Sequence, residues 1–425
     1  MRTLRTKLDR QKKWAHCAST HEPVINIELG MSMNTFYGEN PPASSPNWVK
    51  NSHPLGIQTK THVMPTPQGF QRVHDYLLQD QSRILLPKER VSKCRRFRID
   101  KTKPRTVMYN ENRKKAHYGN VQICGSIWTC PVCAKQITEK RRQELKTGLE
   151  KWKVVHHRSV YLLTLTFSHT KDQPLKVLLE GLRKAMKRFY ETTKVQAIFK
   201  KLAVEYKIKG LEVTYGQNGW HPHHHVLLLV NHHDLRFKDY IKELTELWIK
   251  ACVKSGLNAP SMQHGLDLRN GYYAEQYVSK WGIEDEVTKG HTKKGRNGGY
   301  TPFDLLNMSI QDEEIYGKKP SKLWQEFAIS MKGARQLEWG RGLKKYLEIE
   351  EKTDEELAEE TDKASITLTP VEDLIFHLLC KFQMRHQYLE AVQNDYESGC
   401  FGNGSADRLV NEIVNREIKE LENAY

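Results

Sequence analysis

Four of the chain's 19 histidines lie within the five positions 221–225, and an apolar segment rich in leucine and valine follows them directly. If residues 222–230 form a β-strand, side chains alternate between its faces, and His223 and His225 share one face. His221 joins them only if the strand begins earlier. Two imidazoles side by side on a rigid strand supply two ligands for a divalent metal ion. A histidine cluster without a metal is the alternative, and the strand spacing favours the metal.

A Gly-Gln-Asn-Gly turn separates this strand from a second β-prone region that ends at Tyr215. Asn-Gly between two strands is a strong signal for a hairpin with a two-residue loop. If the Asn-Gly pair forms the loop, counting outward along both strands places Glu212 opposite His225. Directly opposed residues project to the same face, so Glu212 is the predicted third metal ligand. A longer loop would shift the register by one residue and leave Glu212 as an exposed strand carboxylate.

Four of the eight cysteines lie between residues 94 and 133, ahead of the histidine region. Cys130 and Cys133 form a CxxC pair, Cys124 lies six residues before it, and Cys94 lies further upstream. Four thiolates held tetrahedrally would make a closed structural zinc site. A thioredoxin-like redox pair is the alternative for CxxC, but no βαβ pattern surrounds it and basic residues do. The sequence therefore predicts structural zinc bound by these four cysteines.

Lysine and arginine total 67 against 51 acidic residues, and the net charge of +16 suits a polyanionic partner such as nucleic acid. Basic residues with interleaved aromatic rings concentrate over 88–118, which suits single-stranded DNA, although a solvated basic loop is the alternative. A second basic stretch, 284–300, lacks the Lys-Ser/Thr of a phosphate-binding Walker loop, so no ATP use is expected. The predicted DNA contacts are Arg95, Arg96, Arg98, Lys293, Lys294 and Arg296.

Residues 272–281 contain good helix formers and no helix breaker. In a helix, Tyr273, Tyr277 and Lys280 share one face because they are spaced by four and three residues. Alone, this pattern is typical of an amphipathic helix whose tyrosines pack and whose lysine extends to solvent. Beside a metal-binding histidine pair, it indicates a nucleophile instead.

These groups together suit the cleavage of a phosphodiester. The metal would polarise the phosphodiester, and a tyrosine would attack phosphorus to give a covalent phosphotyrosine and a free 3′-hydroxyl. Because an unperturbed phenol has a pKa of about 10, Lys280 and the metal would be needed to favour phenolate. The phosphotyrosine keeps the energy of the cut bond, so rejoining needs no ATP.

Three motifs occur in an order that resembles the HUH-superfamily initiators of rolling-circle replication, in the two-tyrosine type found in some phages and plasmids. Residues 163–166, Leu-Thr-Leu-Thr, are similar to the first motif. The His223-His224-His225 triplet resembles the HUH motif, but His224 stands where the family usually has a bulky apolar residue. That departure leaves His221 or His224 as an alternative ligand.

The third motif involves the tyrosines, and a further likeness involves the cysteines. Tyr273-x-x-x-Tyr277-x-x-Lys280 resembles the two-tyrosine motif, and the cysteine segment resembles the one that precedes the nuclease domain of plasmid Rep proteins. The resemblance implies that Tyr277 is the primary nucleophile and Tyr273 the second. Some relatives use one tyrosine and a glutamate-activated water, but Glu275 lies off the tyrosine face of the expected helix.

The resemblance also implies the fold, the cofactors and the partners. We expect an α+β HUH endonuclease domain with a central antiparallel sheet flanked by helices. The resemblance further implies dependence on Mg²⁺ or Mn²⁺ and the nicking of one strand at a replication origin. Strand transfer between the two tyrosines would then terminate replication. Single-stranded and origin DNA, a host helicase and the replication machinery are the expected partners.

The domains expected from the sequence are four. Residues 1–88 form a basic, partly disordered segment, and residues 89–153 hold the zinc-binding cysteines and a helix. Residues 154–347 form the nuclease domain, and residues 348–425 form an acidic linker and a helical tail. In the last helix, an apolar stripe that includes Leu409 and Ile413 could mediate self-association.

No apolar run of about 18 residues and no secretory signal is evident, so a cytoplasmic protein without a membrane span is expected. Two other functions remain open. An HUH transposase or conjugative relaxase would use the same chemistry at other DNA ends. A non-enzymatic zinc-ribbon protein would bind DNA while the histidine cluster remained incidental.

Overall fold

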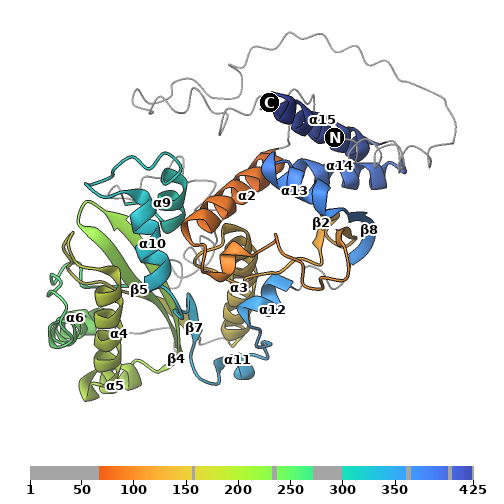
Figure 1. Cartoon of the computed structure of the whole chain (residues 1–425). Helices are drawn as coiled ribbons and strands as arrows, with labels where there is room; N and C mark the ends of the chain where they lie inside the picture. The colour runs from red at the N-terminus through yellow and green to blue at the C-terminus, as the bar shows by residue number, and fades with distance from the viewer. Residues whose placement is uncertain are drawn as a thin grey trace, which may run out of the picture.

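The computed structural model (Figure 1) describes residues 67–155, 158–231, 237–270, 299–359, 365–400 and 404–423. Over these ranges the chain has an α+β fold in which two antiparallel sheets are flanked by helices. The predicted class is therefore confirmed at the level of α+β with a central antiparallel sheet. No helix within the described ranges is both long and apolar enough to cross a membrane.

The larger sheet has five antiparallel strands in the order β6-β3-β5-β4-β7. Its third strand in that order, β5, is buried on both faces beyond the histidines. Leu227 and Leu229 face one side and Val226 and Leu228 the other, as a strand with period two requires. The strands are β3 (Ser159–Leu165), β4 (Val204–Gly216), β5 (Gly219–Val230), β6 (Leu266–Arg269) and β7 (Leu337–Trp339).

Different helices cover the two faces of this sheet. On the face of Val226, the core includes Leu182 of α4 and Trp248 of α6. On the face of Leu227, Leu145 and other apolar residues of α3 complete a second core. These helices and their neighbours are α3 (Pro131–Lys153), α4 (Leu175–Glu191), α5 (Thr193–Lys201), α6 (Phe237–Lys254), α9 (Pro302–Met308), α10 (Pro320–Ser330) and α11 (Leu343–Tyr346).

A second unit joins segments far apart in the sequence. Strands β1 (Arg105–Asn110) and β2 (Lys115–Gly119) form a sheet with β8 (Ser365–Val371) in the order β2-β1-β8. Its core is completed by α13 (Asp373–Lys381), α14 (Arg385–Glu397) and α15 (Ser405–Glu422). The expected division of residues 89–153 from residues 348–425 is therefore crossed by strand pairing, which local periodicity does not reveal.

The apolar stripe of α15 packs inside the chain. Leu409 and Ile413 are buried in the core that they share with α13 and α14, so this helix finds its helical partners within its own unit. The segment that was expected to be an acidic linker also packs: α12 (Asp354–Glu359) lies against α3, with Leu357 buried. Its packing is supported by Lys140, which donates to the Leu357 carbonyl oxygen at 2.7 Å.

The first described helix, α2 (Pro67–Leu85), lies between these parts (Figure 1). It packs against α3, α9 and α10 on the side of the large sheet and against α14 of the second unit. The short 3-10 helix η5 (Arg90–Ser92) follows it and leads into the cysteine segment.

Candidate metal centres

The hairpin that carries the histidines closes one residue earlier than the sequence predicted. Gly216 pairs with Gly219, so Gln217 and Asn218 form the loop. Gly219 has a φ of +86°, a left-handed conformation that favours glycine, and it therefore ends the turn and begins β5. A Cβ atom there would come within 2.9 Å of the Lys171 Cα atom.

The predicted pairing of Glu212 with His225 is therefore wrong, since Glu212 lies opposite His223. The error amounts to two residues along the partner strand. Because side chains alternate with a period of two, an even shift keeps every side chain on its predicted face. Glu212 consequently remains beside both histidines, as the prediction required.

Three ligand atoms converge on this face. The Nε2 atoms of His223 and His225 lie 3.2 Å apart, and the Glu212 Oε2 atom lies 3.3 Å and 3.4 Å from them. These side chains are 13%, 17% and 34% exposed respectively, so the group is partly open to solvent. Two imidazole nitrogens and one carboxylate oxygen so close together form a donor set that fits a divalent cation.

The outer ring nitrogens fix which atoms face the centre. The Nδ1 atom of His223 lies 3.4 Å from the His221 carbonyl oxygen, which can only accept, so Nδ1 carries the proton and Nε2 is left bare. The Nδ1 atom of His225 lies 3.0 Å from the Thr164 Oγ1 atom. Thr164 lies directly opposite His225 in the β3–β5 pair. The sequence pointed to the motif that contains Thr164 but not to this contact.

The carboxylate of the group is held in its ionised form. Burial would raise the pKa of Glu212, but its close contacts with the His223 and His225 rings outweigh burial and keep this pKa well below its ordinary value. An ionised carboxylate is the form that ligates a metal ion, so no proton has to leave Glu212 at neutral pH before a cation binds.

The two alternative histidines lie outside this group. Successive residues face opposite sides of a strand, so His224 lies on the other face, where its Nδ1 atom is 3.2 Å from the Gly210 carbonyl oxygen. Burial lowers the pKa of His224 to about 4. His221 shares the face of His223, but its Nδ1 atom is engaged 2.7 Å from the His169 Nε2 atom. Burial lowers the pKa of His221 to about 3.

His169 was not predicted, because it lies in an irregular segment after β3 and no spacing pattern connects it with His221. Its Nδ1 atom lies 2.9 Å from the Asn218 carbonyl oxygen, so Nδ1 donates and Nε2 accepts from His221. Because His221 Nδ1 is engaged by His169, that nitrogen is not available as a metal ligand.

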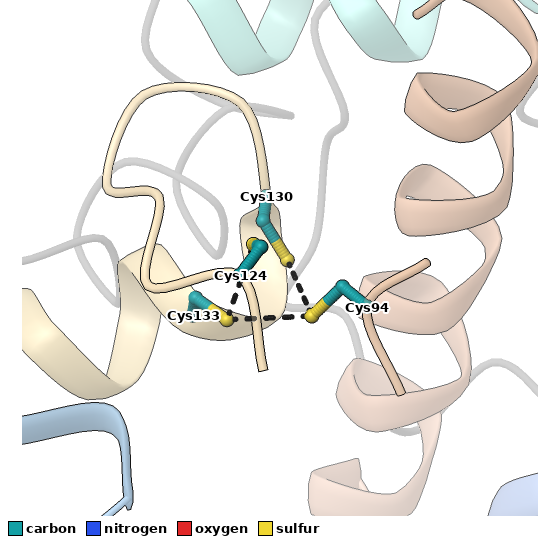
Figure 2. Close-up of side chains that lie close together, drawn as sticks. All are labelled: Cys94, Cys124, Cys130 and Cys133. Atoms are coloured by element: carbon teal, nitrogen blue, oxygen red, sulfur yellow. Dashed lines mark hydrogen bonds between the residues drawn. The ribbon is translucent and has the colours of Figure 1, made fainter. Parts of the chain in front are cut away.

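The four cysteines converge on a second, buried centre. Figure 2 shows their side chains pointing toward one another, with the Cys94 sulfur 3.6 Å from that of Cys133 and 3.8 Å from that of Cys130. The sulfurs of Cys124 and Cys133 are 3.6 Å apart. A tetrahedral zinc ion with Zn–S bonds of about 2.3 Å places its sulfurs about 3.8 Å apart. These spacings match a four-thiolate site, and none is a disulfide.

Local structure and neighbouring donors hold the thiols in place. Cys130 is the N-cap residue of α3 and Cys133 lies in its first turn, so the helix orients the CxxC pair. The Gln79 Nε2 atom donates to the Cys130 sulfur at 3.2 Å, and the Ser126 backbone N–H donates to the Cys124 sulfur at 3.4 Å. Donors that point at sulfur stabilise thiolates, the form that a metal requires.

The three predicted DNA-binding arginines of the cysteine segment have partners within the protein. Arg95 is buried and donates to Gln136. Arg96 pairs with Asp80 at 2.9 Å, and Arg98 pairs with Asp373 at 3.3 Å. Their role in DNA binding stays a prediction, and these contacts give each arginine a position within the folded chain.

The remaining predicted residues lie outside the described ranges. These are the nucleophiles Tyr273 and Tyr277 with Lys280, and the basic residues Lys293, Lys294 and Arg296. The described chain that flanks them belongs to the sheet that carries Glu212, His223 and His225: β6 pairs with β3 on one side, and Tyr300 forms a bridge with Tyr215 of β4 on the other.

Comparison with known proteins gives this geometry a context. A family model described as a replication protein matches residues 116–388, more than half of the chain. "Protein rep" of Streptomyces lividans is 26% identical over 294 residues, which are 53% of this chain and 64% of that protein. A "Neomycin resistance protein" of Streptomyces cyanogenus is 27% identical over 132 residues, 25% of this chain and 30% of that protein. The chain thus spans less than two thirds of either relative. No solved structure matches it.

Proposed function

The chain belongs to the replication protein family, and from this premise we propose that it initiates rolling-circle replication of a plasmid by nicking one strand at the origin. The observation that carries the proposal is the convergence of Glu212, His223 and His225 on one face of the sheet. Origin DNA in single-stranded form is the proposed substrate, and a host helicase and the replication machinery are the proposed partners.

The residues of the candidate site have distinct tasks in this reaction. His223 and His225 present their Nε2 atoms and Glu212 an ionised oxygen, while Thr164 holds the outer nitrogen of His225. Mg²⁺ or Mn²⁺ bound there would polarise the scissile phosphodiester and neutralise charge on its oxygens. The partial exposure of the three ligands leaves room for a phosphate oxygen to approach.

The proposed nucleophile is the phenol oxygen of Tyr277. It attacks phosphorus, the bond from phosphorus to the 3′ oxygen breaks, and the departing oxygen takes up a proton to become the free 3′-hydroxyl primer. The 5′-phosphate remains on Tyr277. Lys280 favours the phenolate. In a later transfer Tyr273 would cut a second phosphodiester in the same way, and the 3′-hydroxyl that it frees would attack the Tyr277 phosphotyrosine, which rejoins a strand and releases the Tyr277 phenol. No ATP is consumed, because the phosphotyrosine keeps the energy of the cut bond.

The cysteine cluster has a structural role in this proposal. A Zn²⁺ ion bound by Cys94, Cys124, Cys130 and Cys133 would be closed to substrate, since all four residues are buried. It would fix the start of α3, the helix that covers one face of the nuclease sheet.

The experiment uses labelled single-stranded oligonucleotides from the replicon that encodes the protein, incubated with Mn²⁺ and separated on denaturing gels. Wild type should give a cut product and a protein–DNA adduct, and Tyr277→Phe and His225→Ala should give neither. Tyr300→Phe is the matched control, because it also removes one tyrosine hydroxyl near the sheet, and it should cut normally. Absence of cutting and adduct with every protein, wild type included, would rule out the nuclease.

A further inference from the structure

One turn of α2 holds the cysteine cluster from outside. Beyond the Gln79 contact with the Cys130 sulfur, Ser82 Oγ donates to the Thr129 carbonyl oxygen at 2.6 Å. Arg83 Nη2 donates to the Cys94 carbonyl oxygen at 2.9 Å. Three residues within one helical turn thus contact both chain segments that supply the cysteines.

The same turn of α2 also binds the C-terminal helical unit, defined here as α13, α14 and α15. Asp80 Oδ2 lies 2.9 Å from Arg385 Nη2, and Arg385 is the first residue of α14. The Arg385 side chain is 1% exposed, and its guanidinium lies 4.3 Å from the centre of the Tyr76 ring. A buried guanidinium is costly unless it is paired, so Asp80 is central to this contact.

Asp80 also pairs with two arginines other than Arg385. Arg96 Nη2 also lies 2.9 Å from Asp80 Oδ2, and Arg83 Nη1 lies 3.5 Å from Oδ1. Three arginines therefore share one carboxylate in a region largely shielded from water, and their positive charge exceeds the negative charge of Asp80. Arg83 also links this group to the cysteine segment, because its Nη2 atom donates to the Cys94 backbone carbonyl oxygen and its guanidinium is near enough for the charge on the Cys94 sulfur to act on it.

Metal binding changes the charge of the cysteine cluster. Four thiolates around Zn²⁺ carry a net charge of two minus, which is more negative than a metal-free cluster in which most of the four thiols keep their protons. Because charges interact more strongly through protein than through water, this negative charge offsets the excess positive charge of the arginines. The metal-free cluster compensates less of the excess positive charge and so weakens the burial of Arg385.

We propose that zinc loading of the cysteine cluster stabilises the docking of the C-terminal helical unit, through the turn of α2 that joins Cys94 and Cys130 to Arg385. The inference rests on the proposed structural zinc site. The coupling is reciprocal, because a contact that zinc strengthens must strengthen zinc binding by the same factor. When zinc is removed, the contact between α14 and α2 opens. The contacts of α14 with β2 remain, because α14 packs on β2 independently of α2.

Hydrogen exchange followed by mass spectrometry tests the first direction of the coupling. The full-length protein is measured as purified and after zinc removal by a chelator, with its zinc content determined in each state. Zinc removal should accelerate exchange at least fivefold in peptides from the start of α14, Arg385 to Glu390, while peptides from β3 and β5 change less. Equal protection of α14 with and without zinc would overturn the inference.

Zinc retention tests the reverse direction. Arg385→Met removes one positive charge and keeps an apolar stem of similar length, so the variant should lose zinc to a competing chelator at a concentration at least fivefold lower than wild type. The control is Arg416→Met. Arg416 is also in the C-terminal helical unit and also stacks on a ring, that of Phe382 at 4.5 Å, but it pairs with Glu420 rather than Asp80.

The outcomes separate this inference from the proposal on which it rests. If the purified protein holds no zinc, the structural zinc site itself fails. If zinc is bound and Arg385→Met retains it as firmly as wild type and Arg416→Met do, the site stands and the coupling is wrong. If Arg416→Met loses zinc as readily as Arg385→Met, the effect is general destabilisation of the helical unit, which also overturns the specific role of Arg385.

Discussion

The two candidate metal centres lie on neighbouring parts of one chain, yet they differ in burial and donor set. The histidine centre offers three ligands on a strand face, each partly exposed. The cysteine centre offers four ligands that are at most 3% exposed. An incomplete, accessible ligand set leaves a position for substrate, and a complete, buried set does not. The comparison predicts that losing a ligand of the first centre costs activity, whereas losing one of the second costs folding.

Cys130→Ser should have the largest effect. It removes one thiolate from a closed site and leaves a buried hydroxyl and three unpaired thiols, so we expect more than about 4 kcal/mol of lost unfolding free energy. Chemical denaturation in the presence of zinc measures the change. Cys400→Ser is the control, because Cys400 is exposed and lies apart from the cluster; it should unfold like wild type. If the Cys130→Ser protein were as stable as wild type, the cysteine centre would not be a structural site.

His225→Ala should have the opposite profile. Nicking should fall at least about a hundredfold, because the metal's contribution to the transition state amounts to several kcal/mol. The midpoint of thermal unfolding without added metal should change by only a few degrees, since this side chain is partly exposed. His264→Ala removes an exposed histidine outside the site and should leave both measurements unchanged. Unfolding of His225→Ala at ambient temperature would show that this centre is structural.

How far the sequence predicted each centre depends on whether the information is local. The histidine centre follows from strand alternation and one turn, so Glu212 was assigned correctly to the group although its pairing was displaced by two residues. Cys94 was predicted from the number of ligands that zinc requires rather than from spacing. Its place beside Cys133 is set by η5 and α2, which bring the upstream segment back to α3.

Other features of the fold could not be predicted because they join distant segments. Nothing near Arg96 in the sequence shows that it pairs with Asp80, or that Arg385 shares the same carboxylate. Likewise, β1 is a short strand with no local mark of its partner β8, more than 250 residues later. Ion pairs and strand pairs of this kind depend on tertiary packing, which periodicity and composition do not encode.

Thr164→Val tests whether the histidine centre depends on a residue that is not itself a ligand. Valine keeps the shape but removes the Oγ1 atom that lies 3.0 Å from His225 Nδ1, so the ring loses its orientation. We expect metal affinity to fall by about 10- to 100-fold, as for other outer-shell partners of metal-bound histidine. Titration of Mn²⁺ against nicking, with a direct Mn²⁺ binding measurement beside it, gives the affinity. Thr214→Val, on the same face of β4 and opposite His221, is the control. Equal Mn²⁺ affinity in the two variants would show that Thr164 does not position His225.

His224→Phe should have the smallest effect, and it separates the two faces of one strand. Burial lowers the folded-state pKa of His224 to about 4, below the value of about 6.5 for an unfolded chain. The unfolded state therefore binds more protons between these values, and stability falls as the pH drops below about 6.5. Relative to its value at neutral pH, the wild-type free energy of unfolding should lose about 1.4 kcal/mol from this residue at a pH of about 5.5. Phenylalanine cannot take up a proton, so the variant should lack that part of the loss, measured as denaturation midpoints at both pH values. If His224→Phe showed the same pH dependence as wild type, His224 would be accessible to protons in the folded chain. The face of β5 that carries His224 would then be as open to solvent as the face that carries His223 and His225.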